Sequence, residues 1–545
     1  MDNNNSIQEK LNSNDSLLLK ENLFQKIIRL IVKFELFIIA AIAGLIGILE
    51  IFITARFDSL FYHPSEYTNF FFSFGFLNIL FSILLIGMIY LANKFIFKKV
   101  KPRYLIAAFL IPITFLFFYW INALRLNPEV DQKMIEEIAK SINGNWVDYY
   151  LQLPQYLFLY PYQLALAYFI AIVYKIFGEN YLYIEYINAI CSVINLVILY
   201  LISNSIFKSE KNQKTLSYLL LGFSLYWMFF NVHYYGNIIG LTPALLSVLF
   251  LLYFLESEKI RYVVLSSVLV TLSILIKTNY YIFFCGIILV LILYAIKKCT
   301  PKVLVPISIF IAAFIIVKGS YSIFVSNVLK IDLPKGTPMI TYIYMGMDET
   351  EGVTPGWYNQ DNYTLYEKNG FDYDKTVSYT KDLISQRTSF FVSHPGEFIK
   401  FYAIKFGSTW LNPTFQTVWT SLPGQRYNWY PEYNHYLGYH ETLLSMVGGD
   451  LFKVEEFMFK SLQIIVFIFA AISIVFDSNK YDLKIIFPLV IFIGGLLFHL
   501  IWETKAIYVI QYYFLLLPFS ANGINRCLEQ LELLIKKQNE KASKN

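Results

Sequence analysis

The chain has 545 residues, of which 57% are hydrophobic, 19% are aromatic and only 15% are charged, and its mean hydropathy is +0.50. A soluble protein would have about 25% charged residues, so the composition excludes a soluble enzyme and predicts a polytopic membrane protein. The net charge of +5 is small, and the basic residues lie in short loops and in the C-terminal tail, which does not fit a nucleic-acid-binding surface.

The N-terminal residues precede the membrane part of the chain. Residues 1–20 are polar and rich in Asn and Ser, which predicts a disordered tail, and residues 22–34 form a basic amphipathic lead-in. We expect no cleavable signal peptide, so that the first apolar segment acts as the membrane anchor.

Apolar segments fill most of the remaining chain, in runs long enough to cross a hydrocarbon core of about 30 Å as helices. They are continuous and do not alternate, which excludes the strands of a membrane barrel. These segments lie near residues 35–55, 72–97, 104–123, 156–177, 181–206, 215–231, 238–256, 260–276, 280–297, 303–320, 456–476, 482–501 and 506–521.

Basic residues assign the loops to two sides of the membrane. The loop 94–103 contains five Lys and Arg residues and is cytoplasmic by the positive-inside rule. The same rule places the other basic turns and the C-terminal tail in the cytoplasm, and therefore both termini. The loop after residue 124 and the long segment 321–455 then face outward. The cytoplasmic turns are those near residues 208–214, 259–261, 297–302 and 480–484.

One apolar segment conflicts with this assignment. Two such segments lie between Asp131, which is expected outside, and Lys208, which is expected inside, whereas an odd number of crossings is required. We expect the segment near 154–177 to lie at the interface without crossing, because it contains the tyrosines of Tyr160-Pro161-Tyr162-Gln163. The alternative is that one short turn violates the charge bias.

The predicted fold class is an all-α polytopic membrane protein with about 12–13 transmembrane helices and a large outer loop before the last three spans. We expect localisation in the plasma membrane, with the functional face outside. The predicted organisation is a cytoplasmic tail and lead-in at 1–34, two N-terminal spans at 35–103, a transmembrane core at 104–320 with an outer loop at 124–180, a large outer loop or small domain at 321–455, C-terminal spans at 456–521 and a basic tail at 522–545.

Charged residues at the outer ends of spans are candidates for a functional site. Asp131 opens an acidic, helix-competent segment directly after an apolar span, although an Asp at that position is also a good helix N-cap. Lys277 and Lys505 end spans at the same side and suit an anionic head group such as a lipid phosphate. Either lysine taken alone is explained equally well by snorkelling to the interface.

Other outer residues are weaker candidates. Asp148 is a second carboxylate on the loop of Asp131, and Asn237 and Tyr280 belong to short outer turns. Trp357 lies in Gly356-Trp357-Tyr358-Asn359 of the large loop, where aromatic and amide side chains are the types that stack on sugars and bind hydroxyls. A small domain that packs its own aromatics explains them as well.

Cysteine usage adds no site. Cys191, Cys285, Cys299 and Cys527 lie in spans or in loops expected in the cytoplasm, which supports neither a disulfide framework nor a cysteine metal site.

These motifs resemble a family, the integral-membrane GT-C glycosyltransferases, in the branch of the protein O-mannosyltransferases and the lipid A aminoarabinose transferase. The resemblance depends on Asn127-Pro128-Glu129-Val130-Asp131 followed by a helix, and on Tyr160-Pro161-Tyr162-Gln163 before an apolar helix that ends at Phe177-Gly178. Further matches are Tyr344-Met345-Gly346-Met347, and Trp502-Glu503-Thr504-Lys505 with Tyr508. The two N-terminal spans depart from the simplest layout of the family.

The resemblance implies an inverting sugar transfer from a polyprenyl-phosphate-linked donor to a glycan, lipid or protein acceptor outside the cytoplasm. It implies Asp131 as the general base, with Lys277 and Lys505 holding the donor phosphate. Glu503 would orient Lys505, bind the sugar, or share a divalent cation with Asp131. Members of the family differ in metal dependence, so the resemblance does not decide the metal.

Two other classes of protein share parts of this pattern. A polytopic transporter or lipid flippase would also have about twelve spans, but the chain has no internal repeat of span lengths and few ionisable residues near the middle of its spans. A membrane polysaccharide polymerase would also have a large outer loop, and would differ in using a diphosphate-linked oligosaccharide as its donor.

Overall fold

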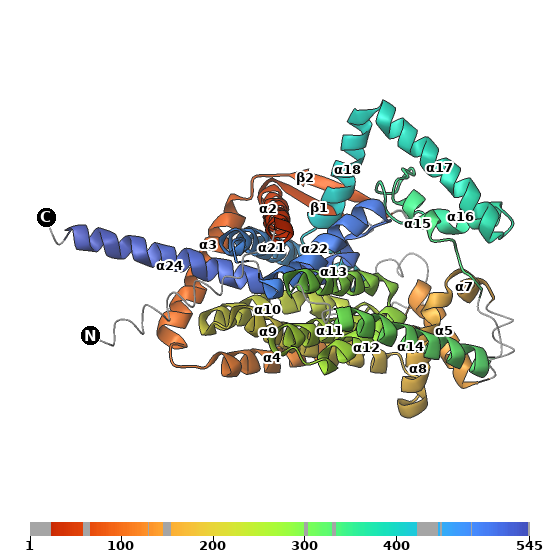
Figure 1. Cartoon of the computed structure of the whole chain (residues 1–545), viewed down its shortest axis with the longest axis horizontal. Coiled ribbons are helices and arrows are strands. Elements are labelled where there is room, and N and C mark those ends of the chain that lie inside the picture. Colours follow the sequence, from red (N-terminus) through yellow and green to blue (C-terminus); the bar gives the residue numbers. More distant parts are fainter. Residues whose placement is uncertain are drawn as a thin grey trace.

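The computed structural model describes residues 23–57, 66–128, 130–144, 154–298, 304–329, 334–421, 445–446, 449–480 and 482–542. This part of the chain is almost entirely helical (Figure 1). The first half contains α2 (Leu23–Phe52), β1 (Ile53–Phe57), β2 (Thr68–Phe72), α3 (Phe76–Leu91), η1 (Ala92–Ile96), α4 (Pro102–Leu124), α5 (Val130–Asn143), α7 (Pro154–Leu159), η2 (Pro161–Gln163), α8 (Leu164–Phe177), α9 (Leu182–Phe207), α10 (Glu210–Phe230), α11 (Asn237–Ser257) and α12 (Arg261–Ile276).

The second half continues the helical body and adds the large loop between α14 and α21. Its elements are η3 (Thr278–Tyr280), α13 (Tyr281–Lys298), α14 (Leu304–Leu329), α15 (Ile340–Met345), α16 (Asp361–Lys368), α17 (Tyr373–Ser393), α18 (Pro395–Trp410), η5 (Val418–Ser421), α21 (Asp450–Asp477), α22 (Leu483–Ile501), η7 (Ala506–Tyr508), α23 (Ile510–Phe514) and α24 (Leu517–Ala542).

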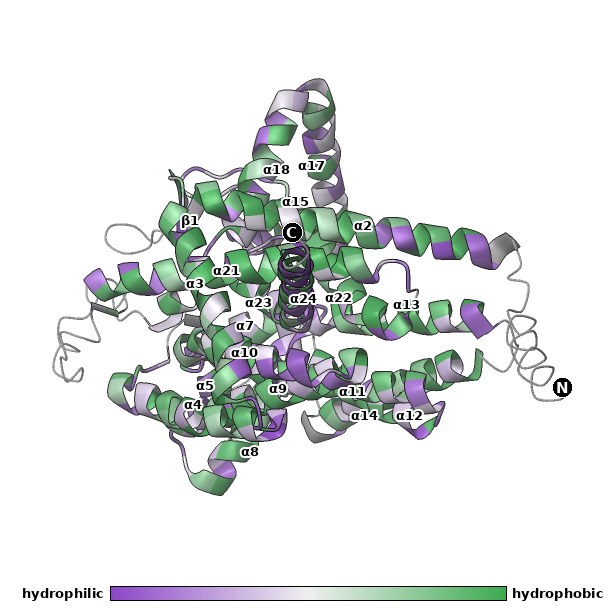
Figure 2. Ribbon diagram, turned by 90° about the vertical axis from the view of Figure 1, so that its left-hand side faces the viewer, coloured by the Kyte–Doolittle hydropathy of each residue, from purple (hydrophilic) through white to green (hydrophobic). Residues whose placement is uncertain are grey.

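The predicted fold class is confirmed, because each predicted apolar segment is helical over most of its length; only residues 53–55 and 72, at the ends of two segments, belong to the strands β1 and β2. Nine helices of the described chain are long and apolar enough to span a membrane, and the segments Pro161–Phe177 and Arg261–Ile276 are shorter apolar helices. The two other predicted segments lie in α10 and in the succession η7, α23 and α24. Figure 2 shows that the helices of the body are mostly hydrophobic along their length, whereas α24, seen end-on, is hydrophilic.

The helix α8 has a different orientation from the long helices, and the interpretation that the segment near 154–177 does not cross stays a prediction. With η2 it forms the apolar helical stretch Pro161–Phe177, which is about as long as α12. Figure 1 shows α8 lying across α9, α11 and α12 rather than alongside them. Its apolar residues pack with those of α5 in a separate cluster that includes Ile135, Ile138, Leu164 and Ile170.

The basic turns that were assigned to one side of the membrane do meet at one end of the bundle. Lys208 pairs with Glu256, and Lys298 pairs with Glu258. The ammonium of Lys214 donates to the carbonyl oxygen of Phe97, at 2.9 Å. Helix α12 begins in this group of turns and ends just before Lys277, so the residues at its other end lie at the opposite face of the bundle.

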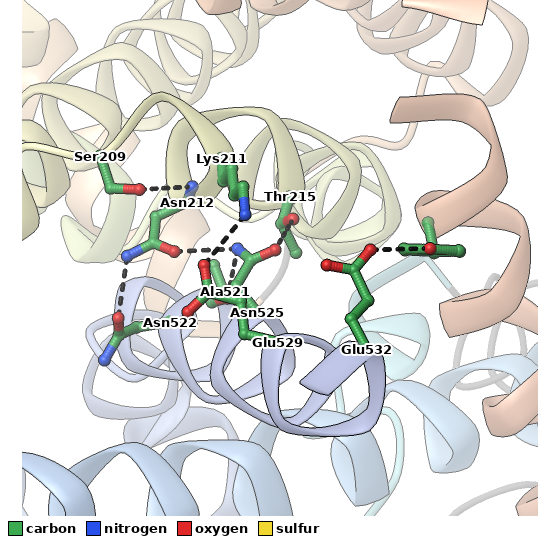
Figure 3. Close-up of polar contacts among 10 residues, drawn as sticks. Ser209, Lys211, Asn212, Thr215, Ala521, Asn522, Asn525, Glu529 and Glu532 are labelled. Carbon is green, nitrogen blue, oxygen red and sulfur yellow. Dashed lines mark hydrogen bonds and ion pairs between the residues drawn. The ribbon is translucent and has the colours of Figure 1, made fainter. Parts of the chain in front are cut away.

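Polar side chains fasten α24 to α10 at the same basic end (Figure 3). Lys211 forms an ion pair with Glu529 at 3.0 Å. The amide of Asn212 donates to Asn522, at 2.9 Å, and accepts from Asn525, at 2.8 Å. Because buried amides are stable only when their hydrogen bonds are satisfied, this network fixes the relative position of the two helices.

The two N-terminal spans pack on the C-terminal part of the chain. Helix α2 lies mainly against α21, and α3 also contacts α21. Between them, β1 and β2 form an antiparallel pair in which Ile53 is opposite Phe72 and Phe57 is opposite Thr68. The amide of Ala55 donates to the carbonyl oxygen of Leu411, at 2.8 Å, which ties this hairpin to the end of α18.

Candidate functional site at the end opposite the basic turns

Asp131 lies in the first turn of α5, and its neighbour Gln132 fixes the start of that helix. The Gln132 side chain accepts from the backbone amide of Tyr234, at 3.1 Å, and lies 3.0 Å from Nδ1 of His233. Burial, with Lys277 nearby, lowers the pKa of His233 to about 3, so His233 is neutral and Nδ1 accepts from the Gln132 amide. The turn before α11 therefore anchors Asp131.

The Asp131 carboxyl is exposed, yet protein groups surround it. Desolvation by those surroundings raises its pKa above the ordinary value of 3.8, while Lys505 and Lys277 pull the pKa down. The hydroxyls of Tyr156 and Tyr235 also donate to the carboxylate and lie 3.2 Å from each other. Asp131 is the second residue of α5 and not its N-cap, and its carboxylate is held by tyrosines from α7 and from the turn before α11.

Lys277 lies in the turn after α12 and is buried. Its ammonium lies 3.8 Å from the centroid of the Tyr235 ring, in a cation–π contact. Burial lowers its pKa from 10.5 to about 7, against the opposing effect of the carboxyls of Asp131 and Glu503. In the described part of the chain no carboxylate forms an ion pair with Lys277, so this cation is available to an anionic ligand.

Glu503 and Lys505 follow α22 and approach the same place. Glu503 is buried, and burial raises its pKa to about 7 although Lys505 lowers it. One of its carboxylate oxygens, Oε2, has no hydrogen-bond partner in the described structure. Lys505 pairs with Glu66, a residue that the sequence did not suggest, and its ammonium lies 5.2 Å from the centroid of the Tyr358 ring.

The large loop holds residues 502–505 in an extended conformation. Thr504 forms a parallel bridge with Trp357, and its amide donates to the carbonyl oxygen of Gly356, at 3.1 Å. The amide of Glu503 donates to the carbonyl oxygen of Tyr342, also at 3.1 Å. The residues between α14 and α18 are therefore part of the site's framework.

Lys405 of α18 supports this framework from inside. Its side chain is fully buried, and its ammonium donates to three backbone carbonyls, those of Gly346 at 2.5 Å, Leu500 at 2.9 Å and Trp502 at 2.8 Å. Gly356 lies so close that an added Cβ would be 2.6 Å from Cδ of Lys405. Nothing in the sequence singled out Lys405, because it occurs in an ordinary amphipathic stretch and its partners are backbone atoms.

Tyrosine hydroxyls join the interfacial segment to the large loop. Tyr160 lies 3.4 Å from the hydroxyl of Tyr358, and Tyr162 lies 3.4 Å from that of Tyr342. The amide of Asn362 donates to both Tyr160 and Tyr342. The Tyr160-Pro161-Tyr162-Gln163 motif thus serves to place the large loop against the start of the site.

The other candidate residues have different positions. The Trp357 indole is buried and donates to Ser408, at 3.0 Å. The hydroxyl of Tyr280 donates to the carbonyl oxygen of Asn237, and both residues are buried. Asp148 lies outside the described residues. The structure therefore brings together Asp131, Lys277, Glu503 and Lys505, and gives Trp357 and Tyr280 packing contacts.

No metal site is evident in the part of the chain that the structure describes, where no three His, Cys, Asp or Glu side chains are placed to hold an ion. Lys505 and Lys277 act on the carboxyl of Asp131, whereas the carboxyl of Glu503 interacts both with lysines and with the carboxylate of Glu66. The requirement for a divalent cation remains an open prediction.

The fold is that of a multi-pass helical membrane protein with a carboxylate and two lysines gathered at one end of the bundle. A family model described as dolichyl-phosphate-mannose-protein mannosyltransferase matches residues 162–320. This match confirms the resemblance over that part of the chain and supports a membrane glycosyltransferase of the GT-C type. No curated protein and no solved structure matches the chain. Lys277 lies within the matched residues, whereas Asp131, Glu503 and Lys505 lie outside them.

Proposed function

We propose that the protein transfers a sugar from a polyprenyl-phosphate-linked donor to an acceptor at the extracytoplasmic face, with inversion at the anomeric carbon. The single observation that carries this proposal is the placement of the Asp131 carboxyl within electrostatic reach of Lys277 and Lys505. Transfer from a lipid phosphate requires one base and cations for the leaving group, and those groups meet at this end of the bundle. The general type of donor also agrees with the family match.

The reaction is a single displacement. The acceptor oxygen forms a bond to the anomeric carbon of the donor sugar while the bond from that carbon to the phosphate oxygen breaks. The proton of the acceptor hydroxyl passes to Asp131, and the electron pair of the broken bond leaves with the polyprenyl phosphate. Attack from the face opposite the leaving group inverts the configuration.

Each residue contributes through its surroundings. The raised pKa of Asp131 makes its carboxylate a better proton acceptor than an ordinary aspartate. The donor is a phosphodiester with one negative charge, and the product monophosphate gains a second charge as it leaves. Lys277 and Lys505 would therefore bind the phosphate more strongly as the reaction proceeds, which is the condition for lowering the barrier.

A cell-surface glycan analysis tests this function. A strain that lacks the protein is complemented with wild type, with Asp131→Asn or with Glu137→Gln, a partly exposed carboxylate on the same helix that pairs with Lys140. Asparagine keeps the shape and the capping ability of aspartate but cannot accept the proton. We expect wild type and Glu137→Gln to restore one sugar decoration that Asp131→Asn does not restore at equal membrane abundance.

Two other outcomes of the glycan analysis would contradict the proposed function. Full restoration by Asp131→Asn would remove Asp131 as the base and reduce its role to positioning α5. A deletion strain with unchanged surface glycans and an altered distribution of lipid-linked sugars across the membrane would instead favour a flippase.

A further inference from the structure

Glu66 connects the N-terminal hairpin to the site. It lies two residues before β2, outside the residues that match the family model, and its carboxylate pairs with Lys505. Both partners are mostly buried, with 25% of the Glu66 side chain and 16% of the Lys505 side chain exposed. The second carboxylate oxygen of Glu66 is buried and has no hydrogen-bond partner in the described structure. The charge of Glu66 is therefore directed at Lys505.

The backbone of Glu66 is fixed without help from this ion pair. Both the amide and the hydroxyl of buried Thr354 donate to the carbonyl oxygen of Glu66, at 3.0 Å and 3.1 Å. Strand β1, which pairs with β2, is held at the end of α18 through Leu411, and Phe57 of β1 stacks on Trp357 with ring centroids 5.7 Å apart. The backbone that carries the Glu66 carboxylate is therefore held in place by contacts other than the ion pair with Lys505.

The two lysines of the site consequently differ before any ligand binds. Lys505 has a carboxylate counter-ion, whereas Lys277 rests on the face of an aromatic ring. A carboxylate and a phosphate oxygen are equivalent partners for a lysine ammonium, and one ammonium cannot make its best contact with both. A phosphate that arrives at Lys505 must compete with Glu66.

We infer that Glu66 is a placeholder for the donor phosphate on Lys505, an inference that rests on the proposed function. Glu66 keeps Lys505 positioned and neutralised in the empty site, and it returns to Lys505 when the product leaves. The product phosphate carries more negative charge than the donor, so it binds the two lysines more strongly. A carboxylate that competes for one of them speeds the release of that product.

Binding of polyprenyl phosphate to the full-length protein in detergent micelles tests the inference without turnover. Glu66→Gln keeps the size of the side chain and removes its charge. We expect this variant to bind polyprenyl phosphate about three to ten times more tightly, the change expected from a partly buried ion pair of about 1 kcal/mol. In turnover we expect a lower KM for the donor and stronger inhibition by polyprenyl phosphate. A merely structural role would raise KM instead.

A second ion pair of the same hairpin supplies the control. Arg56 pairs with Glu456 away from the site, so Glu456→Gln loosens the hairpin without touching Lys505. Glu66→Asp, whose shorter side chain withdraws the charge from Lys505, replaces Glu66→Gln if that variant does not reach the membrane. Equal tightening by Glu456→Gln, or unchanged or weaker binding by Glu66→Gln, would overturn the placeholder role.

Lys505→Met separates this inference from the proposed function. Loss of polyprenyl phosphate binding in Lys505→Met, together with no tightening in Glu66→Gln, would overturn the placeholder alone. Binding by Lys505→Met equal to that of wild type would show that Lys505 does not hold the phosphate, and both assignments would fail.

Discussion

The pKa of Lys277 leads to a pH dependence that can be worked out in advance. Burial brings this pKa from 10.5 down to about 7. At pH 7 about half of the free protein then carries the ammonium, and at pH 8 about one tenth does. If the protonated form binds the donor phosphate, kcat/KM falls about fivefold between pH 7 and pH 8, because kcat/KM reports the free enzyme.

The substitution Lys277→Arg removes this dependence. A guanidinium stays protonated throughout the accessible range, and its planar group can stack on Tyr235 in place of the cation–π contact of the ammonium. We expect the alkaline fall in kcat/KM to disappear in Lys277→Arg, even if its maximum rate is lower. The acid limb has the opposite sign, since Asp131 must lose its proton to act as a base. Activity therefore rises with pH through the raised pKa of Asp131.

The assay is a pH series of initial rates with purified protein in detergent, from about pH 5 to pH 9. Lys400→Arg, an exposed lysine on α18, serves as the matched control and should keep the wild-type profile. A bound phosphate stabilises the ammonium and raises its pKa, so kcat should begin to fall at a higher pH than kcat/KM does. An alkaline limb shared by wild type and Lys277→Arg would refute the assignment of Lys277.

Two further predictions concern the framework of the site. Lys405→Met takes the donor away from three backbone carbonyls, one buried and two partly buried. At about 1 kcal/mol for each carbonyl, it should lower the stability by about 3 kcal/mol. Thermal unfolding in detergent checks this, and melting equal to that of exposed Lys400→Met would contradict it. Trp357→Phe removes the indole donor to Ser408 and leaves a small cavity, because Trp357 is buried and phenylalanine is smaller. It should lower stability by about 1–3 kcal/mol with an unchanged KM. A raised KM for donor or acceptor would restore Trp357 as a sugar contact.

The fold was largely predictable because its main features depend on residues that are close together in the sequence. Each membrane helix appears in the sequence as a run of apolar residues, and the basic turns that contact one another at one end were identified by their charge alone. What the sequence did not predict is the hairpin β1–β2, since its pairing and its contact with Leu411 depend on residues far along the chain.

The site was predictable only in part, for a related reason. Asp131, Lys277 and Lys505 are charges at the ends of apolar runs, and such charges stand out against their neighbours. Lys405 and Glu66 also act at this end of the bundle, but Lys405 belongs to an ordinary amphipathic stretch and Glu66 lies among polar residues, so neither charge stands out in the sequence. Their roles come from burial and from partners more than fifty residues away, which only the fold reveals.

The two N-terminal spans can now be given a place in the molecule. They are the departure from the simplest layout of the family, and they lie outside the residues that match its model. They are nevertheless in contact with the framework of the site. Helix α2 packs along α21, and the strands β1 and β2, which lie between α2 and α3, contact the end of α18. Through Glu66 they also place a charge on Lys505. Spans that only anchored the chain would need neither the contact with α18 nor the ion pair with Lys505. We therefore expect removal of residues 1–75 to change polyprenyl phosphate binding and not merely membrane insertion.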